Sequence, residues 1–250
     1  MLAIIQYIIW VLANAFLSLR YRVTVEGLDK VRGLKQTLVL PNHPAYMDPP
    51  LTLKTVWPAL HPRPMVFEGV FESPFLFWIP MVLNAVKVPN LEQHSAQARE
   101  QAQQSIGAII EGLKRGDNHI LWPAGRLYRQ DHEELGSARA LAEILAAVPD
   151  ANVVVVRNRG LWGSSFGHAY TGKHPVLINR LVFGVSMILA NFIFFMPRRR
   201  ITITVEQLDR SKFPHFGQRR RRRHRQRRQK RRHQRRQWGQ RLRRRHLRRR

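Results

Sequence analysis

A histidine and an aspartate five residues apart form the pair in this sequence best suited to acid–base chemistry. The stretch Thr37–Pro50 reads T-L-V-L-P-N-H-P-A-Y-M-D-P-P, so an apolar run leads directly into Asn42, His43 and then Asp48. A neutral imidazole, with a pKa of about 6.5, can take the proton of a hydroxyl as that hydroxyl attacks an acyl carbonyl. A nearby carboxylate fixes the imidazole tautomer and stabilises the imidazolium. No serine nucleophile is needed where the substrate brings its own hydroxyl.

The elements around this pair decide whether the two side chains can meet. The apolar run before His43 predicts a strand, and open α/β sheets bind ligands at the carboxyl ends of their strands. On a regular helix five residues turn through about 500°, so His43 and Asp48 would not share a face. Pro44 and Pro49–Pro50 bracket the segment. They favour a tight turn or a helix start, where the carboxylate can fold back onto the imidazole. A purely structural role for such a pair stays open.

Strand and helix patterns alternate along the rest of the chain. Val153–Val156 is an uninterrupted apolar run, typical of a strand buried on both faces. In Glu92–Arg115 apolar residues recur at three- and four-residue steps, and Ser137 can cap a second helix that Pro149 ends. The predicted strands are Tyr21–Glu26, Thr37–Leu40, Ala85–Val88, His119–Trp122, Asn152–Val156 and Ile201–Glu206. We expect an α/β fold with a mixed, mostly parallel sheet flanked by helices, an N-terminal hydrophobic membrane helix and a disordered basic tail.

Three segments are unusually apolar for such a domain. Met1–Leu19 has only three polar residues and is followed at once by two arginines. Its length fits a spanning helix or a helix lying in the interface, with a buried core helix as the alternative. Basic residues after the segment would keep the next domain at the cytoplasmic face of the inner membrane. Met65–Val86 and Leu181–Met196 could each be core, or could rest on lipid together with the first helix.

The formal net charge of +27 is concentrated at one end of the chain. Residues 218–250 hold 20 Lys+Arg and no acidic residue, which leaves residues 1–217 with a net charge of +7. The predicted parts are a membrane-anchoring helix at 1–19, an α/β domain at 20–217 and a disordered tail at 218–250. The tail could bind RNA or anionic lipid, or could carry no selected function. With no cysteine, disulfides, thiol nucleophiles and thiolate metal sites are excluded.

These motifs resemble those of the PlsC-type glycerolipid acyltransferases. N-H-P-A-Y-M-D is similar to the family's N-H-x4-D motif, and L-W-P-A-G-R at Leu121–Arg126 lies where the family has its F-P-E-G-T-R block. The resemblance covers roughly Tyr21 to Asp209. It implies transfer of a fatty acyl group from acyl-CoA or acyl carrier protein to the hydroxyl of a lysophospholipid or glycerol-phosphate lipid, in phospholipid biosynthesis or remodelling. It further implies that His43 is the general base and Asp48 its partner.

Other positions depart from the family pattern and affect the expected acceptor. Ala124 stands where the family has a glutamate, and the family's second-block arginine falls near Asn90. These changes weaken simple glycerol-phosphate binding and leave lysophospholipid acylation open. Arginine side chains can hold a phosphate bidentately, and backbone amides near a glycine can form an oxyanion site. The candidate substrate-binding residues are Asn42, Lys87, Gly125, Arg126, Arg129 and Arg157.

The remaining polar clusters give weaker signals. His168 and His174 have no carboxylate between them, so no metal site is expected. Asp131–Glu134 is interpreted as a solvent-facing loop, and no phosphate-binding glycine loop indicates ATP chemistry. The expected partners are membrane lipids and an acyl thioester co-substrate, with no resident cofactor and no nucleic acid except through the tail. Two alternatives are a catalytically impaired lipid-binding protein of the same fold and a protein whose basic tail binds RNA or anionic membranes.

Overall fold

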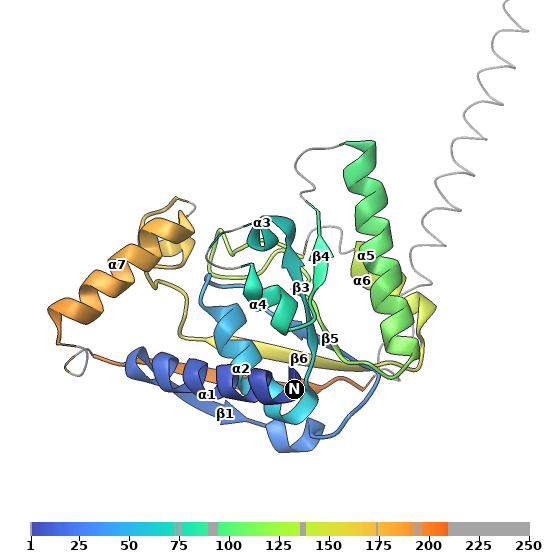
Figure 1. Ribbon diagram of the computed structural model, residues 1–250, viewed down its shortest axis with the longest axis horizontal. Helices are drawn as coiled ribbons and strands as arrows, with labels where there is room; N and C mark the ends of the chain where they lie inside the picture. Colours follow the sequence, from blue (N-terminus) through green and yellow to red (C-terminus); the bar gives the residue numbers. More distant parts are fainter. Residues whose placement is uncertain are drawn as a thin grey trace, which may run out of the picture. The chain divides into compact units, whose positions relative to one another are not determined.

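Seven strands form one sheet at the centre of the described structure. The computed structural model describes residues 2–72, 74, 77–89, 95–135, 139–173, 175–192, 195 and 197–209. The strand order is β1-β7-β6-β2-β5-β3-β4, and neighbouring strands are parallel except β6 and β7 (Figure 1). The strands are β1 (Tyr21–Glu26), β2 (Thr37–Pro41), β3 (Arg63–Phe67), β4 (Val86–Val88), β5 (His119–Ile120), β6 (Asn152–Arg159) and β7 (Arg199–Gln207). The expected mixed, mostly parallel α/β sheet is confirmed.

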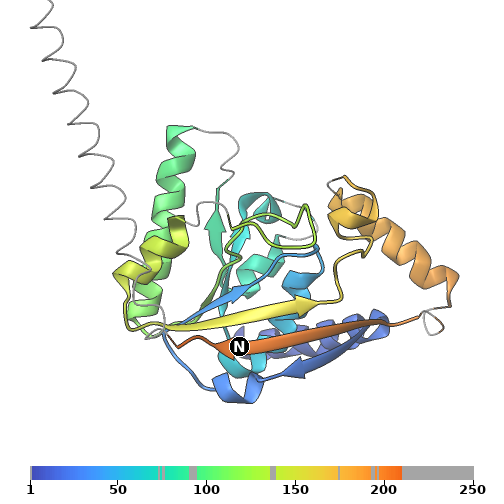
Figure 2. The ribbon, with the colours of Figure 1, turned by 180° about the vertical axis from the view of Figure 1, so that it is seen from behind.

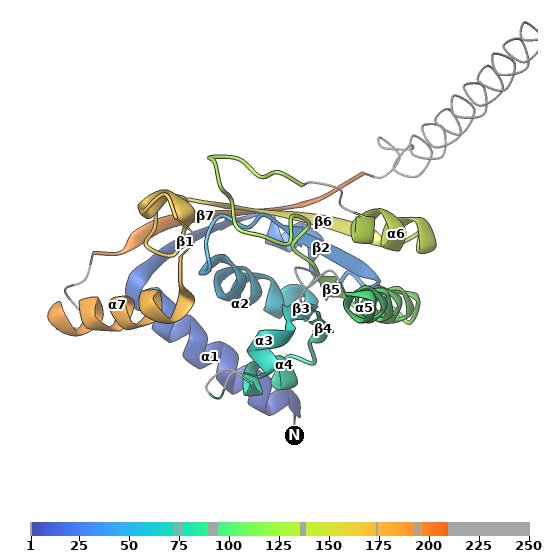
Figure 3. The ribbon, with the colours of Figure 1, turned by 90° about the horizontal axis from the view of Figure 1, so that it is seen from above.

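Helices cover both faces of this sheet, because adjacent residues of a strand point to opposite sides. Val39 of β2 packs in one core cluster with residues of α1 and α2, whereas its neighbour Leu38 packs with residues of α5 and α6. Figure 3 shows α1 and α2 together on one side of the strands, and Figure 2 shows β6 and β7 side by side. The helices are α1 (Leu2–Arg20), α2 (Asp48–Leu60), α3 (Glu68–Phe71), α4 (Trp78–Val82), α5 (Ala96–Lys114), α6 (Arg139–Ala147) and α7 (Leu177–Ala190), with 3-10 turns η1 (Leu28–Val31) and η3 (His168–Tyr170).

The structure differs from the sequence-based expectation mainly between residues 61 and 95. Residues 65–86 were expected only as an apolar stretch, but β3 begins just before it and pairs with β5 and β4. Pro64 interrupts the apolar pattern of β3, which hides the strand in the sequence. Helix α5 begins at Ala96, where the Ser95 hydroxyl accepts a hydrogen bond from the Ala98 amide at 3.0 Å. The predicted cap Ser137 lies outside the described residues.

Two of the apolar segments form exposed helices. Helix α1 is the one described helix whose length and composition would allow it to cross a membrane. Along its length it is attached to the domain, because the Gln6 side-chain amide donates to the Val82 carbonyl and the Trp10 indole donates to the Lys54 carbonyl, both at 2.8 Å. Helix α7 buries none of its residues. The expected tail, residues 218–250, lies outside the described residues, and the three predicted parts stay predictions.

Candidate active site

His43 and Asp48 meet in a short turn between β2 and α2. The strand ends at Pro41, and α2 begins at Asp48 with prolines in its first turn, where a missing backbone N–H costs nothing. The Asp48 amide donates to the Ala45 carbonyl at 3.1 Å, which closes the turn. His43 Nδ1 then lies 2.8 Å from Asp48 Oδ2. The predicted contact between imidazole and carboxylate is therefore present at the carboxyl end of a central strand.

The Asp48 carboxylate is completely enclosed and surrounded by donors. Its side chain is 0% exposed, whereas that of His43 is 15% exposed. Oδ2 also accepts from the Ala45 amide at 3.2 Å, and Oδ1 accepts from the Trp122 indole N–H at 2.7 Å. Burial raises the pKa of Asp48, while His43 and the N–H donors act in the opposite direction. The three donors fix the orientation of this carboxyl group.

This arrangement determines which ring nitrogen of His43 can act as a base. With Nδ1–H donating to Asp48, neutral His43 carries its proton on Nδ1 and leaves Nε2 unprotonated. When Nε2 takes a proton, the resulting imidazolium faces a carboxylate that is already in hydrogen-bond contact. The Trp122 ring also lies beside the imidazole, with ring centroids 6.0 Å apart. The pair is thus built to accept a proton from a weak acid such as a hydroxyl.

Asn42, a predicted substrate-binding residue, connects three parts of the site. Its side-chain amide donates to the Tyr128 hydroxyl at 2.9 Å and to the Asn158 carbonyl at 3.1 Å. The Asn42 side-chain carbonyl accepts from the Asn158 amide at 2.7 Å. The buried Asn158 side chain in turn contacts the Thr52 hydroxyl of α2 at 2.9 Å. Asn42 therefore joins β2, β6 and the loop after β5, which holds the His43 turn in place.

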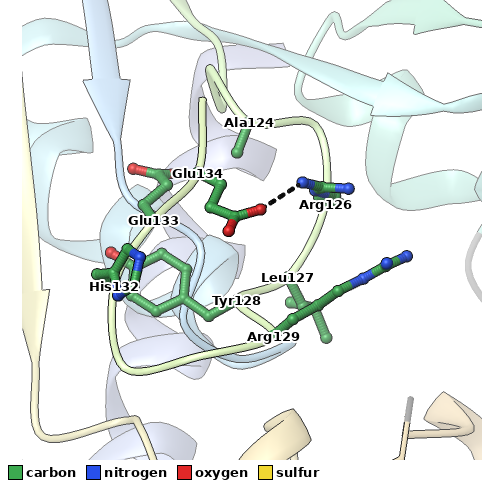
Figure 4. Close-up of a pocket in the computed structure, with 8 residues that line it drawn as sticks. All are labelled: Ala124, Arg126, Leu127, Tyr128, Arg129, His132, Glu133 and Glu134. Atoms are coloured by element: carbon green, nitrogen blue, oxygen red, sulfur yellow. Dashed lines mark hydrogen bonds and ion pairs between the residues drawn. The ribbon is translucent and has the colours of Figure 1, made fainter. Parts of the chain in front are cut away.

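The loop of residues 121–135 carries three more predicted residues and lines a small hollow. Arg126 and Arg129 both line the hollow, and Arg126 makes an ion pair with Glu134 at 3.0 Å across it (Figure 4). Gly125 has a positive φ of 62°, a conformation that favours glycine. Its N–H donates to the Trp122 carbonyl at 3.1 Å, so this amide is engaged in a turn.

The structure does not bring the last two predicted cations to His43. Lys87 lies on β4, three strands away from β2 in the sheet order, and its ammonium is 3.9 Å from the Glu68 carboxylate. Arg157 on β6 pairs with Glu206 of β7 at 3.2 Å. Because side chains alternate along a strand, it is the neighbouring Asn158 whose side chain faces α2, where it donates to the Thr52 hydroxyl at 2.9 Å. The position expected near the second-block arginine, residue 90, lies outside the described residues.

Glu133 corrects the expectation that residues 131–134 all face solvent. Asp131 is 84% exposed, but Glu133 is only partly exposed and its Oε1 atom is fully enclosed. Burial raises the pKa of Glu133 to about 7; His43 lowers it and Asp48 raises it. One carboxylate oxygen of Glu133 is therefore enclosed, unlike the exposed side chain of Asp131. The sequence alone shows four consecutive polar residues and does not distinguish the one that turns inward.

Sequence reasoning also missed two residues that support the pair. The Trp122 indole and the Tyr128 backbone amide both contact the His43 turn, the latter by donating to the His43 carbonyl at 3.0 Å. Trp122 ended a predicted strand, so its place at the carboxyl edge of the sheet could have been a signal. Nothing in the sequence indicates the Tyr128 contact. Among the described residues, no three His, Cys, Asp or Glu side chains group as a metal site requires.

The fold has a known counterpart among solved structures. The chain is similar to the crystal structure of the 1-acyl-sn-glycerophosphate (LPA) acyltransferase PlsC from Thermotoga maritima, with a TM-score of 0.54 and 21% sequence identity. The match covers 78% of this chain but 65% of the Thermotoga chain, slightly less than two thirds of it. No protein-family model matches the sequence, and no curated protein matches it. The likeness shows that the chain has the α/β fold of this acyltransferase.

Proposed function

We propose that the protein is an O-acyltransferase that moves a fatty acyl group from a thioester to a lipid hydroxyl. The observation that carries this proposal is the hydrogen bond between His43 Nδ1 and the buried Asp48 carboxylate at the carboxyl end of β2. The acyltransferase fold of the similar Thermotoga enzyme supports the same reaction class. The donor is acyl-CoA or acyl carrier protein, and the acceptor is a lysophospholipid or a glycerol-phosphate lipid.

The reaction follows from the tautomer that Asp48 imposes. His43 Nε2 takes the proton of the acceptor hydroxyl as its oxygen attacks the thioester carbonyl, and Asp48 stabilises the imidazolium that forms. The tetrahedral intermediate then collapses, the carbon–sulfur bond breaks, and the imidazolium returns its proton to the departing thiolate. The products are an ester and a free thiol, and His43 is neutral again. No metal or resident cofactor takes part in these steps.

The charges around the site fit an anionic substrate group. Arg126 and Arg129 line the hollow next to the His43 turn and hold a phosphate of the donor or the acceptor. When Arg126 binds that phosphate, it gives up its ion pair with Glu134. This ion pair is exposed to solvent, so breaking it costs little free energy.

The apolar helices fit an enzyme that works on a membrane. Helices α1 and α7 expose large apolar side chains along their lengths, and such helices bind the membrane interface through buried apolar area. Helix α7 has 14 residues and is about 21 Å long, too short for a hydrocarbon core of about 30 Å. It therefore lies on the bilayer. From Arg20 and Arg22, the basic residues at the end of α1, we infer that the domain lies at the cytoplasmic face of the inner membrane.

An acyl-transfer assay tests this proposal. The full chain is incubated with radiolabelled acyl-CoA or acyl carrier protein and with a panel of lysophospholipids and glycerol phosphate in vesicles. We expect a labelled lipid ester, a diacyl lipid where the acceptor is a lysophospholipid, that forms only when both the thioester and one acceptor are present. Vesicle binding without any labelled ester, across the whole panel, would reject catalysis and leave a lipid-binding protein.

A further inference from the structure

Arginines gather at one corner of the sheet, where β1 and β7 begin and β6 ends (Figure 2). Helix α1 ends at Arg20 and leads directly into β1, while β7 is the strand that follows α7. In the pairing of β1 with β7, Tyr21 is the partner of Arg199 and Arg22 is the partner of Arg200. The members of this arginine corner are Arg20, Arg22, Arg159, Arg198, Arg199 and Arg200. The strand pairing therefore brings cations from α1, β1, β6 and β7 together.

No carboxylate pairs with the arginine corner in the part of the chain that the structure describes, where every ion pair involves another cation. Two of the arginines contact neutral groups instead. Arg20 donates to the Pro197 carbonyl. Arg199 donates to the carbonyls of Gly160 and Trp162. A guanidinium has more N–H donors than these carbonyls use, so both side chains keep donors for a further acceptor.

The strand pairing also places like charges beside each other. Arg22 and Arg200 are partners on neighbouring strands, which lie about 4.8 Å apart, and like charges in such a pair destabilise a sheet. Both side chains and that of Arg198 are exposed, and no hydrogen bond or ion pair to another described residue engages them. An anion that contacts these guanidiniums relieves a repulsion that is built into the sheet.

Exposed apolar side chains flank the same corner. Phe16, one turn before Arg20 in α1, is 57% exposed. Leu189 in the last turn of α7 and Phe192 just after it are 62% and 78% exposed. A membrane surface offers lipid phosphates directly beside hydrocarbon, so it can contact the arginines and the apolar groups together. A nucleic acid would neutralise the arginines but leave the apolar groups in water, so the combination favours a lipid surface.

We propose that the arginine corner binds the phosphate groups of anionic phospholipid headgroups, beside the membrane contact of α1 and α7. A guanidinium can hold two oxygens of a phosphate at once. Each arginine near an anionic membrane surface strengthens binding about fivefold. The corner turns the end of the sheet where β1 and β7 begin toward the headgroups. This inference extends the proposed membrane enzyme, but it concerns lipid binding and does not require acyl transfer.

Vesicle binding of the full chain tests the proposal. A corner variant combines Arg22→Gln, Arg198→Gln and Arg200→Gln, which removes exposed charges and keeps the carbonyl contacts of the other corner arginines. Binding is measured by co-sedimentation with vesicles of phosphatidylcholine, with and without phosphatidylglycerol. On the anionic vesicles, the dissociation constant of the corner variant should rise roughly 100-fold, at about fivefold per arginine. Binding to phosphatidylcholine alone should match that of the parent chain.

A matched control separates the position of the charges from their number. Lys30→Gln, Arg32→Gln and Lys35→Gln remove the same charge from exposed positions beyond the other end of β1. Both variants keep the arginine-rich residues 218–250. We expect the control to bind anionic vesicles within a few-fold of the parent chain. Equal losses in the two variants would overturn the proposal, because net charge alone then explains them.

A second measurement reports contact at the corner itself, whatever residues 218–250 contribute to binding. Since the chain has no cysteine, Thr24→Cys places a single fluorophore on the same sheet face as Arg22. Phosphatidylglycerol with a nitroxide on its headgroup should quench this fluorophore in the parent background and less in the corner variant. Equal quenching would overturn the proposal. So would a corner variant that loses binding to oligouridine RNA but keeps parental vesicle binding. Failure of the proposed enzyme appears separately, as absence of acyl transfer.

Discussion

Replacing Asp48 by asparagine removes the carboxylate charge while keeping the volume of a fully buried side chain. Three donors converge on the two oxygens of Asp48: His43 and Ala45 on Oδ2, and Trp122 on Oδ1. An asparagine has one acceptor oxygen and one NH2 group, so it must leave one of these donors facing another donor. Which donor is mispaired decides the effect on catalysis.

The hydrogen-bond distances indicate which orientation of the asparagine side-chain amide is favoured. If the asparagine oxygen faces His43 and Ala45, the short 2.7 Å bond from Trp122 is lost. If the oxygen faces Trp122, only the longer 3.2 Å bond from Ala45 is lost, because His43 can change tautomer and accept from the NH2 group. The second orientation sacrifices the weaker bond and moves the His43 proton to Nε2. In serine proteases the corresponding loss of the correct tautomer lowers kcat by about 10⁴.

We therefore expect Asp48→Asn to lower kcat for acyl transfer by about 10³- to 10⁴-fold and the free energy of unfolding by about 1–3 kcal/mol. The kcat is measured with saturating thioester, alongside Asp29→Asn, which changes an exposed carboxylate of η1. In a Trp122→Phe background the competing indole donor is gone, so Asp48→Asn should cost less activity than in the parent chain. A kcat for Asp48→Asn within a few-fold of the parent value would refute this reasoning.

Three further predictions concern packing, acid stability and membrane binding. In Gly112→Ala the new Cβ would lie 2.2 Å from Nε2 of the fully buried His119, so the free energy of unfolding measured in urea should fall by about 1–3 kcal/mol. Gly107 lies in the same helix with open space around it, so Gly107→Ala should raise the free energy of unfolding by about 0.5–1 kcal/mol. Burial lowers the pKa of His119 to about 4, so the unfolded chain takes up a proton at a higher pH than the folded chain does. The free energy of unfolding should therefore fall by up to about 3 kcal/mol as the pH drops from 6.5 to 4. His119→Gln should lack this pH-dependent loss. Paired Val182→Glu and Leu189→Glu changes on exposed α7 should reduce co-sedimentation with vesicles containing anionic lipid, and unchanged binding would remove α7 from the membrane contact.

Local sequence signals were sufficient to predict the central pair. An apolar strand before His43 and prolines on both sides of Asp48 restrict the backbone so strongly that the turn and the helix start follow from them. The alternation of strands and helices likewise predicted the sheet, because each pattern reflects burial of a strand or a helix face. Strand β3 was not predicted from the sequence because Pro64 breaks its short apolar pattern.

The surroundings of the pair depend on contacts that sequence spacing does not encode. Glu133 and Asp131 have the same charge and belong to the same loop, yet Glu133 has an enclosed carboxylate oxygen whereas Asp131 is 84% exposed. Arg157 was chosen for its charge, but it pairs with Glu206, and strand alternation turns the side chain of Asn158 instead toward Thr52 of α2. Lys87 lies on β4 rather than on β2, which leads into His43, and its ammonium pairs with the Glu68 carboxylate of α3. Side-chain type suggested these residues, and only the tertiary fold determines which ones meet.

The rate of acyl transfer by His43→Ala tests the proposed chemistry most directly. His61→Asn, an exposed histidine at the end of α2 in a left-handed conformation that asparagine tolerates, serves as the control. With folding verified by circular dichroism, we expect His43→Ala to lose at least about 10³-fold in kcat while His61→Asn keeps the parental rate. An alanine variant that forms labelled diacyl lipid as fast as the parent would show that the imidazole is not the base.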